Sequence, residues 1–373
     1  MARVSSSSST LGQYIQQVWE ARGTDLLLTS GVPPLIRVDQ KLRPIEGEPA
    51  LRPADTERLV LSALTESQAA DLANRLEIDF SFSWEEKARF RGNAFHQRDS
   101  LALALRLIPF EIPTMEQLGL PAIVQEMVSK PSGLVLVTGP TGSGKSTTLA
   151  AAIDYINQNR QSHILTIEDP IEYVHHHKLS AVNQREVGTD TESFARALRS
   201  CLREDPDVLM CGEMRDLESI DIALTMAETG HLVFATLHTN DTSQAIDRVV
   251  GVFPAERQDQ IRIQLASTLN GVIYQRLMPR LGGGLAAAFE VLMGTHAVRN
   301  LIREGKTRQL RNAITMGQSE GMQTIEMSLS ELVKSGTVDY DEALLRSLYP
   351  KDVFKPAAQG NGNGAVLQDA ATS

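Results

Sequence analysis

Cysteine and long apolar runs are scarce in this sequence. Its 373 residues include two cysteines, Cys201 and Cys211, which do not form a C-x-x-C pair. Their number and spacing exclude a four-cysteine zinc module and a disulfide framework, so we expect buried, reduced thiols in a cytosolic protein. No apolar run approaches the roughly 20 residues of a membrane-spanning helix, and we therefore expect no direct insertion into a membrane.

An excess of basic residues is also absent. The sequence has 36 lysines and arginines against 46 acidic residues, which gives a net charge of −10. This balance disfavours a nucleic-acid partner, because nucleic-acid-binding domains present a basic footprint. The length and the hydrophobic fraction of 42% are those of an ordinary soluble protein with room for two domains.

The pattern of apolar and polar residues divides the chain into four parts. Residues 1–110 combine short strand-like runs with helical stretches, which predicts a small α+β domain with an antiparallel sheet. Residues 111–118, which contain Pro113, are predicted to be a linker. Residues 119–350 are predicted to form an α/β domain with C-terminal helices. Residues 351–373 are predicted to be a disordered tail because alanine, glycine, glutamine and asparagine dominate them.

Within the predicted α/β domain, four apolar runs have the pattern of buried strands, and each ends in a polar cluster. The runs cover residues 134–137, 164–167, 208–211 and 232–235. Helical segments lie between them, which is the layout of an open parallel sheet. Because ligands bind beyond the carboxyl ends of such strands, the four polar clusters should meet around one ligand. Residues 242–348 are predicted to be mostly helical.

The first polar cluster matches the phosphate-binding loop pattern G-x-x-x-x-G-K-[ST]. It consists of Gly139, Pro140, Thr141, Gly142, Ser143, Gly144, Lys145 and Ser146, with Thr147 directly after it. Glycines let successive backbone N–H groups point at one phosphate, and the N-terminus of the following helix favours an anion. Lys145 can reach the β- and γ-phosphates, and the Ser146 hydroxyl can bind Mg²⁺. The sequence therefore predicts ATP and Mg²⁺ as ligands, with a glycine-rich turn that binds nothing as the weak alternative.

Carboxylates follow two other predicted strands. Glu213 comes directly after residues 208–211, the position of a Walker B residue, and can polarise or hold the attacking water. Glu168 belongs to a second acidic group with Asp169 and Glu172, in which one carboxylate can orient water while another is structural. A solvated carboxylate at a strand end is the alternative for each of them.

Histidines lie on both sides of the fourth predicted strand. His238 follows the strand and can hydrogen-bond the γ-phosphate, so that it senses the state of the nucleotide. His231 precedes the strand, and a nucleotide-binding role and a plain structural role fit it about equally. Residues 175–177 are all histidines, but consecutive side chains converge poorly on one metal ion, and we expect no metal site there.

Arginines of the N-terminal domain can reach a nucleotide from outside the α/β domain. Arg89, Arg91, Arg98 and Arg106 fall on its predicted sheet. ATPases that drive motion often use arginines from another domain or subunit to neutralise developing charge. A solvated sheet face is the alternative for each of these arginines.

Several motifs together resemble the traffic-ATPase family of secretion and type IV pilus ATPases. Segments similar to the family's Asp box, Walker B segment and His box follow the phosphate loop, here as residues 166–173, 211–216 and 228–240. The family pattern R-F-R-x-N-x-F occurs at 89–95. Residues 297–304 resemble the A-I-R-N-L-I-R-E signature of the subgroup that retracts pili, with a valine in place of the first isoleucine.

This resemblance implies a hexameric, ATP-hydrolysing motor that disassembles a type IV pilus and so drives twitching motility. It implies a PAS-like N-terminal domain and a RecA-like ATPase domain, with Arg91 and Arg106 reaching the nucleotide between them. Glu213, Glu168 and His238 would take part in catalysis. The implied partners are the other subunits of a homohexamer and an inner-membrane platform protein of the pilus machinery. The protein would be cytoplasmic and peripheral at the inner face of the membrane when docked.

The sequence leaves three other functions open. A related pilus-assembly, secretion or accessory retraction ATPase shares the same motifs. A nucleotide-dependent binding or regulatory module would bind ATP without sustained turnover. A nucleic-acid translocase shares the core, but the acidic composition disfavours it.

Overall fold

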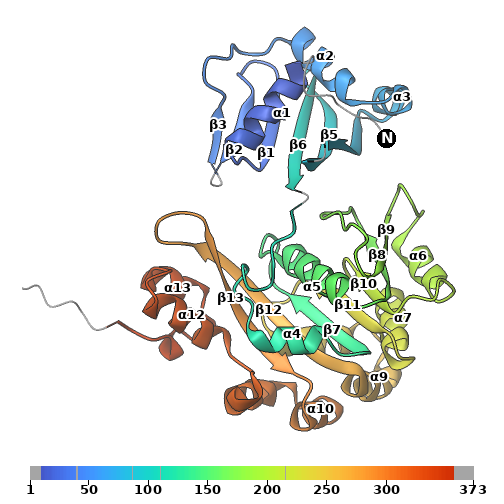
Figure 1. Ribbon diagram of the computed structural model, residues 1–373, viewed down its shortest axis with the longest axis vertical. Helices are drawn as coiled ribbons and strands as arrows, with labels where there is room; N and C mark the ends of the chain where they lie inside the picture. The colour runs from blue at the N-terminus through green and yellow to red at the C-terminus, as the bar shows by residue number, and fades with distance from the viewer. Residues whose placement is uncertain (1–9, 39–40, 86, 110, 215, 357–373) are drawn as a thin grey trace, which may run out of the picture.

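The computed structural model describes residues 10–38, 41–85, 87–109, 111–214 and 216–356. Figure 1 shows two β-sheets, each with its own helices. A single chain segment joins them and follows strand β6 (Ser100–Pro109). We call residues 10–109 the N-terminal unit and residues 111–356 the C-terminal unit.

The N-terminal unit has a six-stranded antiparallel sheet in the order β3-β2-β1-β6-β5-β4, as the alternating pattern predicts. Its other strands are β1 (Asp25–Leu28), β2 (Leu35–Val38), β3 (Lys41–Pro44), β4 (Glu77–Trp84) and β5 (Ala88–Gln97). Its helices are α1 (Thr10–Glu20), α2 (Pro53–Ala63) and α3 (Glu66–Arg75). One sheet face is apolar, and Phe82, Trp84 and Phe90 pack ring against ring on it. This unit therefore has its own core.

The C-terminal unit is built on a seven-stranded sheet in the order β13-β12-β7-β11-β10-β8-β9. The strands are β7 (Gly133–Thr138), β8 (His163–Glu168), β9 (Ala181–Glu186), β10 (Val208–Cys211), β11 (Leu232–Leu237), β12 (Leu269–Pro279) and β13 (Leu285–Met293). Neighbouring strands are parallel except β12 and β13, which are antiparallel. Every residue of β7, β10 and β11 is buried, as expected for a parallel sheet covered on both faces.

Helices cover this sheet and form the C-terminal end of the unit. They are α4 (Ala122–Val128), α5 (Lys145–Asn159), α6 (Phe194–Cys201), α7 (Leu217–Glu228), α8 (Thr242–Gly251), α9 (Ala255–Thr268), α10 (His296–Arg303), α11 (Leu310–Met316), α12 (Ile325–Lys334), α13 (Tyr340–Arg346) and the short η1 (Thr307–Gln309), η2 (Gln318–Glu320) and η3 (Pro350–Asp352). α6, α7 and α8 each begin after a side chain that caps the first turn, namely Ser193, Asp216 and Asp241. In the described part of the chain, no helix is long and apolar enough to cross a membrane.

The prediction that residues 242–348 are mostly helical is wrong for β12 and β13. These strands pair antiparallel over their length, from Gly271 opposite Met293 to Pro279 opposite Leu285. Gly282, Gly283 and Gly284 lie in the hairpin turn between the two strands. The pairing matters for function because β12 also lies beside β7, which carries the phosphate loop.

Two predicted boundaries are also wrong. Met115, inside the predicted linker, is buried in the core of the C-terminal unit, so that core begins before residue 119. Val353, inside the predicted tail, is buried in a second cluster with Ile325. The Phe354 backbone N–H donates to Ser330 Oγ at 2.9 Å. Apolar side chains just outside the predicted bounds of the α/β domain therefore pack into its cores. The rest of the predicted tail, residues 357–373, lies outside the described residues.

Candidate active site

The predicted polar clusters meet at one edge of the seven-stranded sheet. This edge is formed by the carboxyl ends of β7, β11, β10 and β8, which are neighbours in that order. The strand registers bring the last residues of these strands side by side. The phosphate loop, His238, Glu213 and Glu168 therefore lie along a single edge, where a ligand of a parallel α/β sheet binds.

The phosphate loop is a turn whose backbone requires glycine. Gly139, Gly142 and Gly144 have φ angles of 149°, 75° and 86°, in the left-handed region. A Cβ at Gly139 would lie 2.4 Å from the Gln275 carbonyl oxygen, and a Cβ at Gly144 would lie 2.8 Å from the Gln275 amide nitrogen. Gln275 Oε1 also accepts a hydrogen bond from Thr148 at 2.6 Å. β12 thus supports the loop through Gln275 and leaves no space for side chains there.

Lys145 is the first residue of α5, and its side chain is buried against the loop. The ammonium donates to the carbonyl oxygens of Gly139 and Pro140 at 2.9 and 3.0 Å. It also lies 3.5 Å from Nδ1 of His238. Burial lowers the pKa of Lys145, and the nearby Glu213 carboxylate opposes this shift by favouring the charged form. The ammonium is thus held beside the backbone that would surround a phosphate.

His238 connects the loop to the Walker B carboxylate. Its Nε2 lies 3.2 Å from Oε1 of Glu213, while Nδ1 faces Lys145. The next residue, Thr239, is buried and shares a hydrogen bond of 2.7 Å with Thr138, the last residue of β7. This threonine pair fixes the backbone that carries the histidine. Lys145, His238 and Glu213 consequently form a continuous chain of contacts across three strand ends.

Glu168, the last residue of β8, is a buried carboxylate. Its Oε1 accepts hydrogen bonds from Thr166 Oγ1 at 2.6 Å and from Gln184 Nε2 at 3.1 Å, and its Oε2 accepts one from the Glu172 N–H at 3.4 Å. Burial raises the pKa of Glu168 to about 7, although these hydrogen bonds favour the charged form. A carboxyl group with this pKa can take up or release a proton near neutral pH.

No role is predicted from the sequence for three residues that support the site. Gln275 on β12 packs against the loop, and Gln184 on β9 holds Glu168. Tyr173 Oη lies 3.1 Å from Thr147 Oγ1, so it ties the segment after β8 to the first turn of α5. β9 is itself absent from the predicted strands because it is a mostly polar strand at the sheet edge.

Open space for a ligand adjoins the phosphate loop. A cavity of about 340 Å³ lies between the loop, β12 and α13, and its lining residues are Pro140, Thr141, Gly142, Ser143, Arg276, Leu277, Leu345 and Arg346. Ser143 Oγ is buried and has no hydrogen-bond partner among the described residues, so a bound group can satisfy it. Ser146 is in the first turn of α5, where its hydroxyl can hold a Mg²⁺ ion that arrives with the nucleotide.

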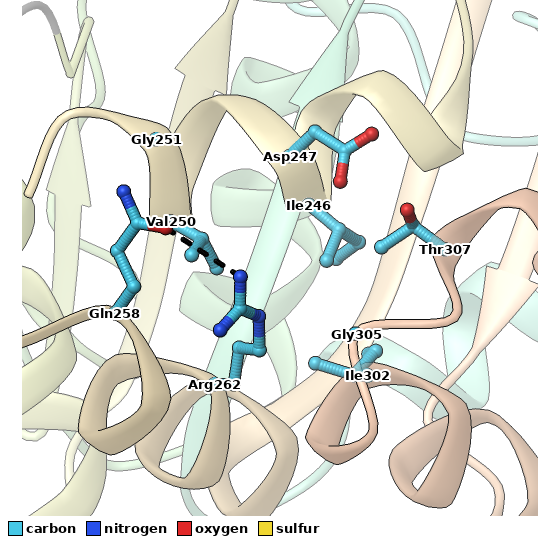
Figure 2. Close-up of a pocket in the computed structure, with 9 residues that line it drawn as sticks. All are labelled: Ile246, Asp247, Val250, Gly251, Gln258, Arg262, Ile302, Gly305 and Thr307. Carbon is cyan, nitrogen blue, oxygen red and sulfur yellow. Dashed lines mark hydrogen bonds between the residues drawn. The ribbon is translucent and has the colours of Figure 1, made fainter. Parts of the chain in front are cut away.

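A second cavity, of about 170 Å³, lies between α8, α9 and the turn after α10. Its lining residues are Ile246, Asp247, Val250, Gly251, Gln258, Arg262, Ile302, Gly305 and Thr307. Figure 2 shows Arg262 extending toward Gln258, while Asp247 on α8 lies near Thr307. None of these lining residues belongs to the loop or to the strand-end clusters, so we assign the nucleotide to the first cavity.

His231 lies at the opposite end of β11 from His238. Its Nδ1 lies 3.0 Å from the Met226 carbonyl oxygen and 3.1 Å from Thr229 Oγ1, at the end of α7. The six residues of β11 separate His231 from the loop by about 20 Å. The prediction that His231 contacts the nucleotide is therefore wrong for a nucleotide bound at the phosphate loop of the same chain. A residue that precedes a parallel strand lies at the edge of the sheet away from the ligand.

Arg91 and Arg106 lie opposite each other on β5 and β6, and both are exposed. Arg106 Nε donates to Asp25 Oδ1 at 2.9 Å. Arg89 precedes Arg91 by two residues on the same sheet face and contacts Glu186 of the C-terminal unit. This face is therefore turned toward the C-terminal unit, and the contact of Arg91 and Arg106 with a nucleotide stays a prediction.

Residues 297–304, which resemble the retraction signature, form most of α10 and have a structural role in this fold. Arg299 donates to three backbone carbonyl oxygens, those of Gly294 at 2.8 Å, Ser267 at 2.8 Å and Leu269 at 3.1 Å. It thereby joins the ends of α9 and β13 to the beginning of β12. These contacts lie at the sheet end away from the phosphate loop.

A buried parallel strand, a glycine-rich loop with its lysine, and carboxylates at the neighbouring strand ends define a P-loop nucleotide-binding protein of the α/β class. The family model "Type II/IV secretion system protein" matches residues 102–328. The chain belongs to this family.

Individual relatives agree with the family model. The "Type IV pilus retractation ATPase PilT" of Pseudomonas aeruginosa is 50% identical over 329 residues, which are 88% of this chain and 95% of that protein. The "Type IV pilus ATPase PilU" of the same organism is 43% identical over 87% of this chain and 85% of its own length. The crystal structure of the pilus retraction motor PilT with bound ADP matches with a TM-score of 0.86 at 49% identity, over 93% of this chain and 99% of that one.

Proposed function

We propose that the chain is an ATPase that uses ATP hydrolysis to power the retraction of a type IV pilus, and with it twitching motility. The observation that carries this proposal is the contact chain Lys145–His238–Glu213 at the strand edge, in a chain that is 50% identical to a pilus retraction ATPase over most of its length. The match to a retraction motor with bound ADP supports nucleotide binding at this edge.

The loop residues 139–147 bind the phosphates. Backbone N–H groups of the glycine-rich turn and the ammonium of Lys145 face the β- and γ-phosphates, because the N-terminus of α5 and the lysine both favour anions. The Ser146 hydroxyl holds Mg²⁺, which supplies positive charge next to the phosphate oxygens. Gln275 keeps the turn in place from β12.

Five side chains act on the reacting phosphate and water. Glu213 positions the attacking water, and Glu168 accepts its proton, because a pKa of about 7 suits a general base at neutral pH. His238 contacts the γ-phosphate and transmits its presence to Glu213 through their 3.2 Å contact. Arg91 and Arg106 neutralise the charge that develops on the phosphoryl group when the N-terminal unit approaches.

We further propose that the subunits form a homohexamer, each with a PAS-like N-terminal domain and a RecA-like ATPase domain. The hexamer docks on an inner-membrane platform protein of the pilus machinery and is cytoplasmic and peripheral at the inner face of the membrane. The names of the relatives support an association with type IV pili. Native mass spectrometry with ATP and Mg²⁺ tests the hexamer, and a monomer under all nucleotide conditions would contradict it.

Steady-state phosphate release tests the activity. We expect Glu213→Gln to lower the rate about 100-fold, because it removes the charge that holds the attacking water. Glu218→Gln, an exposed carboxylate on α7, serves as the matched control and should keep the wild-type rate. Wild-type protein that binds ATP without releasing phosphate would favour a regulatory module, and stimulation by DNA or RNA would favour a translocase.

Pilus counts in a deletion strain test the direction of the motor. Loss of a retraction motor should leave an excess of surface pili without twitching, whereas loss of an assembly motor should leave none. An accessory retraction ATPase is the second candidate because PilU is also similar over most of the chain. Retraction that continues in the deletion strain would favour this accessory role.

A further inference from the structure

One ion pair connects the two units of the chain. Arg89 Nη2, on β5 of the N-terminal unit, lies 3.0 Å from Glu186 Oε2, on β9 of the C-terminal unit. The side chains are 13% and 8% exposed, so water screens this pair only weakly. The same Arg89 nitrogen donates to Ser81 Oγ at 2.7 Å, which fixes the guanidinium to β4. The contact is therefore anchored in the N-terminal sheet and is more than a surface ion pair.

Glu186 also holds the segment that follows Glu168. Its Oε2, the atom that contacts Arg89, accepts a hydrogen bond from the Ile171 N–H at 3.1 Å. Its Oε1 accepts a hydrogen bond from Thr189 Oγ1 at 3.2 Å. One carboxylate oxygen thus contacts the N-terminal unit and the backbone three residues after Glu168.

β9 transmits this contact to Glu168 itself. Glu186 lies directly opposite Glu168 in the parallel register of β8 and β9. Gln184, two residues earlier on the same face of β9, donates to Glu168 Oε1 and to the Tyr173 carbonyl oxygen. Tyr173 in turn reaches Thr147 in the first turn of α5. Contacts therefore run without a break from β5 to the buried carboxylate and to the helix that follows the phosphate loop.

We propose that the Arg89–Glu186 ion pair is a coupling contact that positions Glu168 for ATP hydrolysis when the N-terminal unit lies against β9. Arg89 and Glu186 are positioning residues, since neither lies at the phosphate loop. When the N-terminal unit moves away, Glu186 loses its charge partner, and its Oε2 becomes accessible to water from that side. Water then competes with the Ile171 N–H for this oxygen, so the segment from Glu168 to Tyr173 is held less firmly and is expected to rearrange. This proposal rests on the proposed ATPase function.

Double-mutant kinetics test the coupling. We expect Arg89→Gln and Glu186→Gln each to lower kcat about fivefold with KM for ATP unchanged within about twofold, because the loop that binds ATP is not altered. The double variant should be no slower than either single variant, since the two residues act as one pair. Arg89→Lys, which keeps the charge, should restore part of the rate.

The matched control is Arg185→Gln. Arg185 is next to Glu186 on β9 but pairs with Glu204 inside the C-terminal unit at 2.9 Å. This variant should keep the wild-type kcat. Wild-type kcat in Arg89→Gln, or an equal loss in Arg185→Gln, would overturn the proposal. A wild-type protein without any phosphate release would instead overturn the proposed function.

A distance measurement tests the contact without reference to turnover. The two native cysteines are buried, so exposed cysteines introduced at Ala70 on α3 and Gln125 on α4 can be spin-labelled selectively. The distance distribution between the labels should broaden in Arg89→Gln and stay narrow in Arg185→Gln. Identical distributions in wild type and Arg89→Gln would overturn the proposal.

Discussion

The two ends of the seven-stranded sheet use the same residue types in different ways. At the carboxyl end, Lys145, His238 and Glu213 face one another across neighbouring strands. At the opposite end, His231 and Arg299 bond to backbone carbonyl oxygens. Side chains that contact other ionisable side chains can respond to a ligand, whereas side chains that contact backbone carbonyl groups and neutral hydroxyl groups hold the fold together.

This difference follows from the parallel arrangement of the strands. The carboxyl ends of parallel strands all lead into loops on one edge, so polar side chains from several loops converge there. At the amino ends the chain arrives from helices, whose last carbonyl groups need hydrogen-bond donors. Arg299 supplies two such donors at the junction of α9 and β12, and His231 lies beside the last turn of α7. The partner of a polar residue therefore indicates its role better than its residue type.

Among the variants that test this difference between the two sheet ends, removal of the Lys145 side chain should have the largest effect on activity. We expect Lys145→Ala to lower phosphate release about 1,000-fold, because the variant loses the only side-chain cation of the phosphate loop. Lys306→Ala, an exposed lysine that pairs with Glu304 at the other sheet end, should keep the wild-type rate. Phosphate release measured with folded protein, as judged by circular dichroism, decides this point. Equal rates in the two variants would remove the distinction between the ends.

The sequence was sufficient to predict the loop edge of the sheet. β7, β8, β10 and β11 are continuous apolar runs, and each ends in residues of clear chemistry, such as Lys145 or Glu213. The residues that support this edge from other strands are harder to predict from the sequence. Gln184 acts from a polar edge strand, and Gln275 acts from a strand in a region whose pattern predicts helix. Neither has a spacing that signals its role, because their amide groups act only through tertiary contacts.

His231 shows a different limit of the sequence. The sequence shows that His231 precedes a predicted strand, but only a parallel pairing of that strand with the strand before the phosphate loop places His231 at the end away from the ligand. The register of β11 with β7 supplies this direction. When a site is predicted from sequence, residues that follow a parallel strand are therefore candidates for ligand contact, and residues that precede it are not.

Glu168 should show the second largest effect. We expect Glu168→Gln to lower kcat about 100-fold, because the variant has no group that accepts a proton near neutral pH. Thr166→Val, which removes a hydrogen bond to the carboxylate but keeps the proton acceptor, should lower kcat less. A pre-steady-state measurement with ATP separates loss of binding from loss of chemistry. A wild-type kcat in Glu168→Gln would show that Glu168 does not act as the general base.

The same carboxyl group should also make stability depend on pH. The pKa of Glu168 rises from 4.5 to about 7 on folding, so the folded state keeps a proton that the unfolded state loses. This stabilisation is complete below pH 4.5 and disappears as the pH rises to 7. Urea unfolding should therefore show Glu168→Gln gaining about 3 kcal/mol relative to wild type between pH 4.5 and 7.5. A constant difference would contradict the raised pKa.

At the opposite end, Arg299 should affect stability and not chemistry. We expect Arg299→Ala to lower the free energy of unfolding by about 2 to 3 kcal/mol, because three carbonyl groups lose their charged donor. Arg303→Ala, on the exposed face of the same helix, should cost less than about 0.5 kcal/mol. Urea unfolding measures both values. A lower kcat in folded Arg299→Ala would show that this end also affects the catalytic edge.

The two histidines that flank β11 give the smallest and most closely matched test. His238→Gln keeps hydrogen-bonding capacity but cannot become charged beside Glu213, and we expect about a tenfold lower kcat. His231→Gln, one strand length away, should stay within about twofold of wild type because its ring contacts only Met226 and Thr229. Both variants are compared by phosphate release at saturating ATP. A slower His231→Gln variant would show that the edge with the phosphate loop is not the whole site. Residues at the amino ends of the strands would then have to act on a nucleotide bound elsewhere.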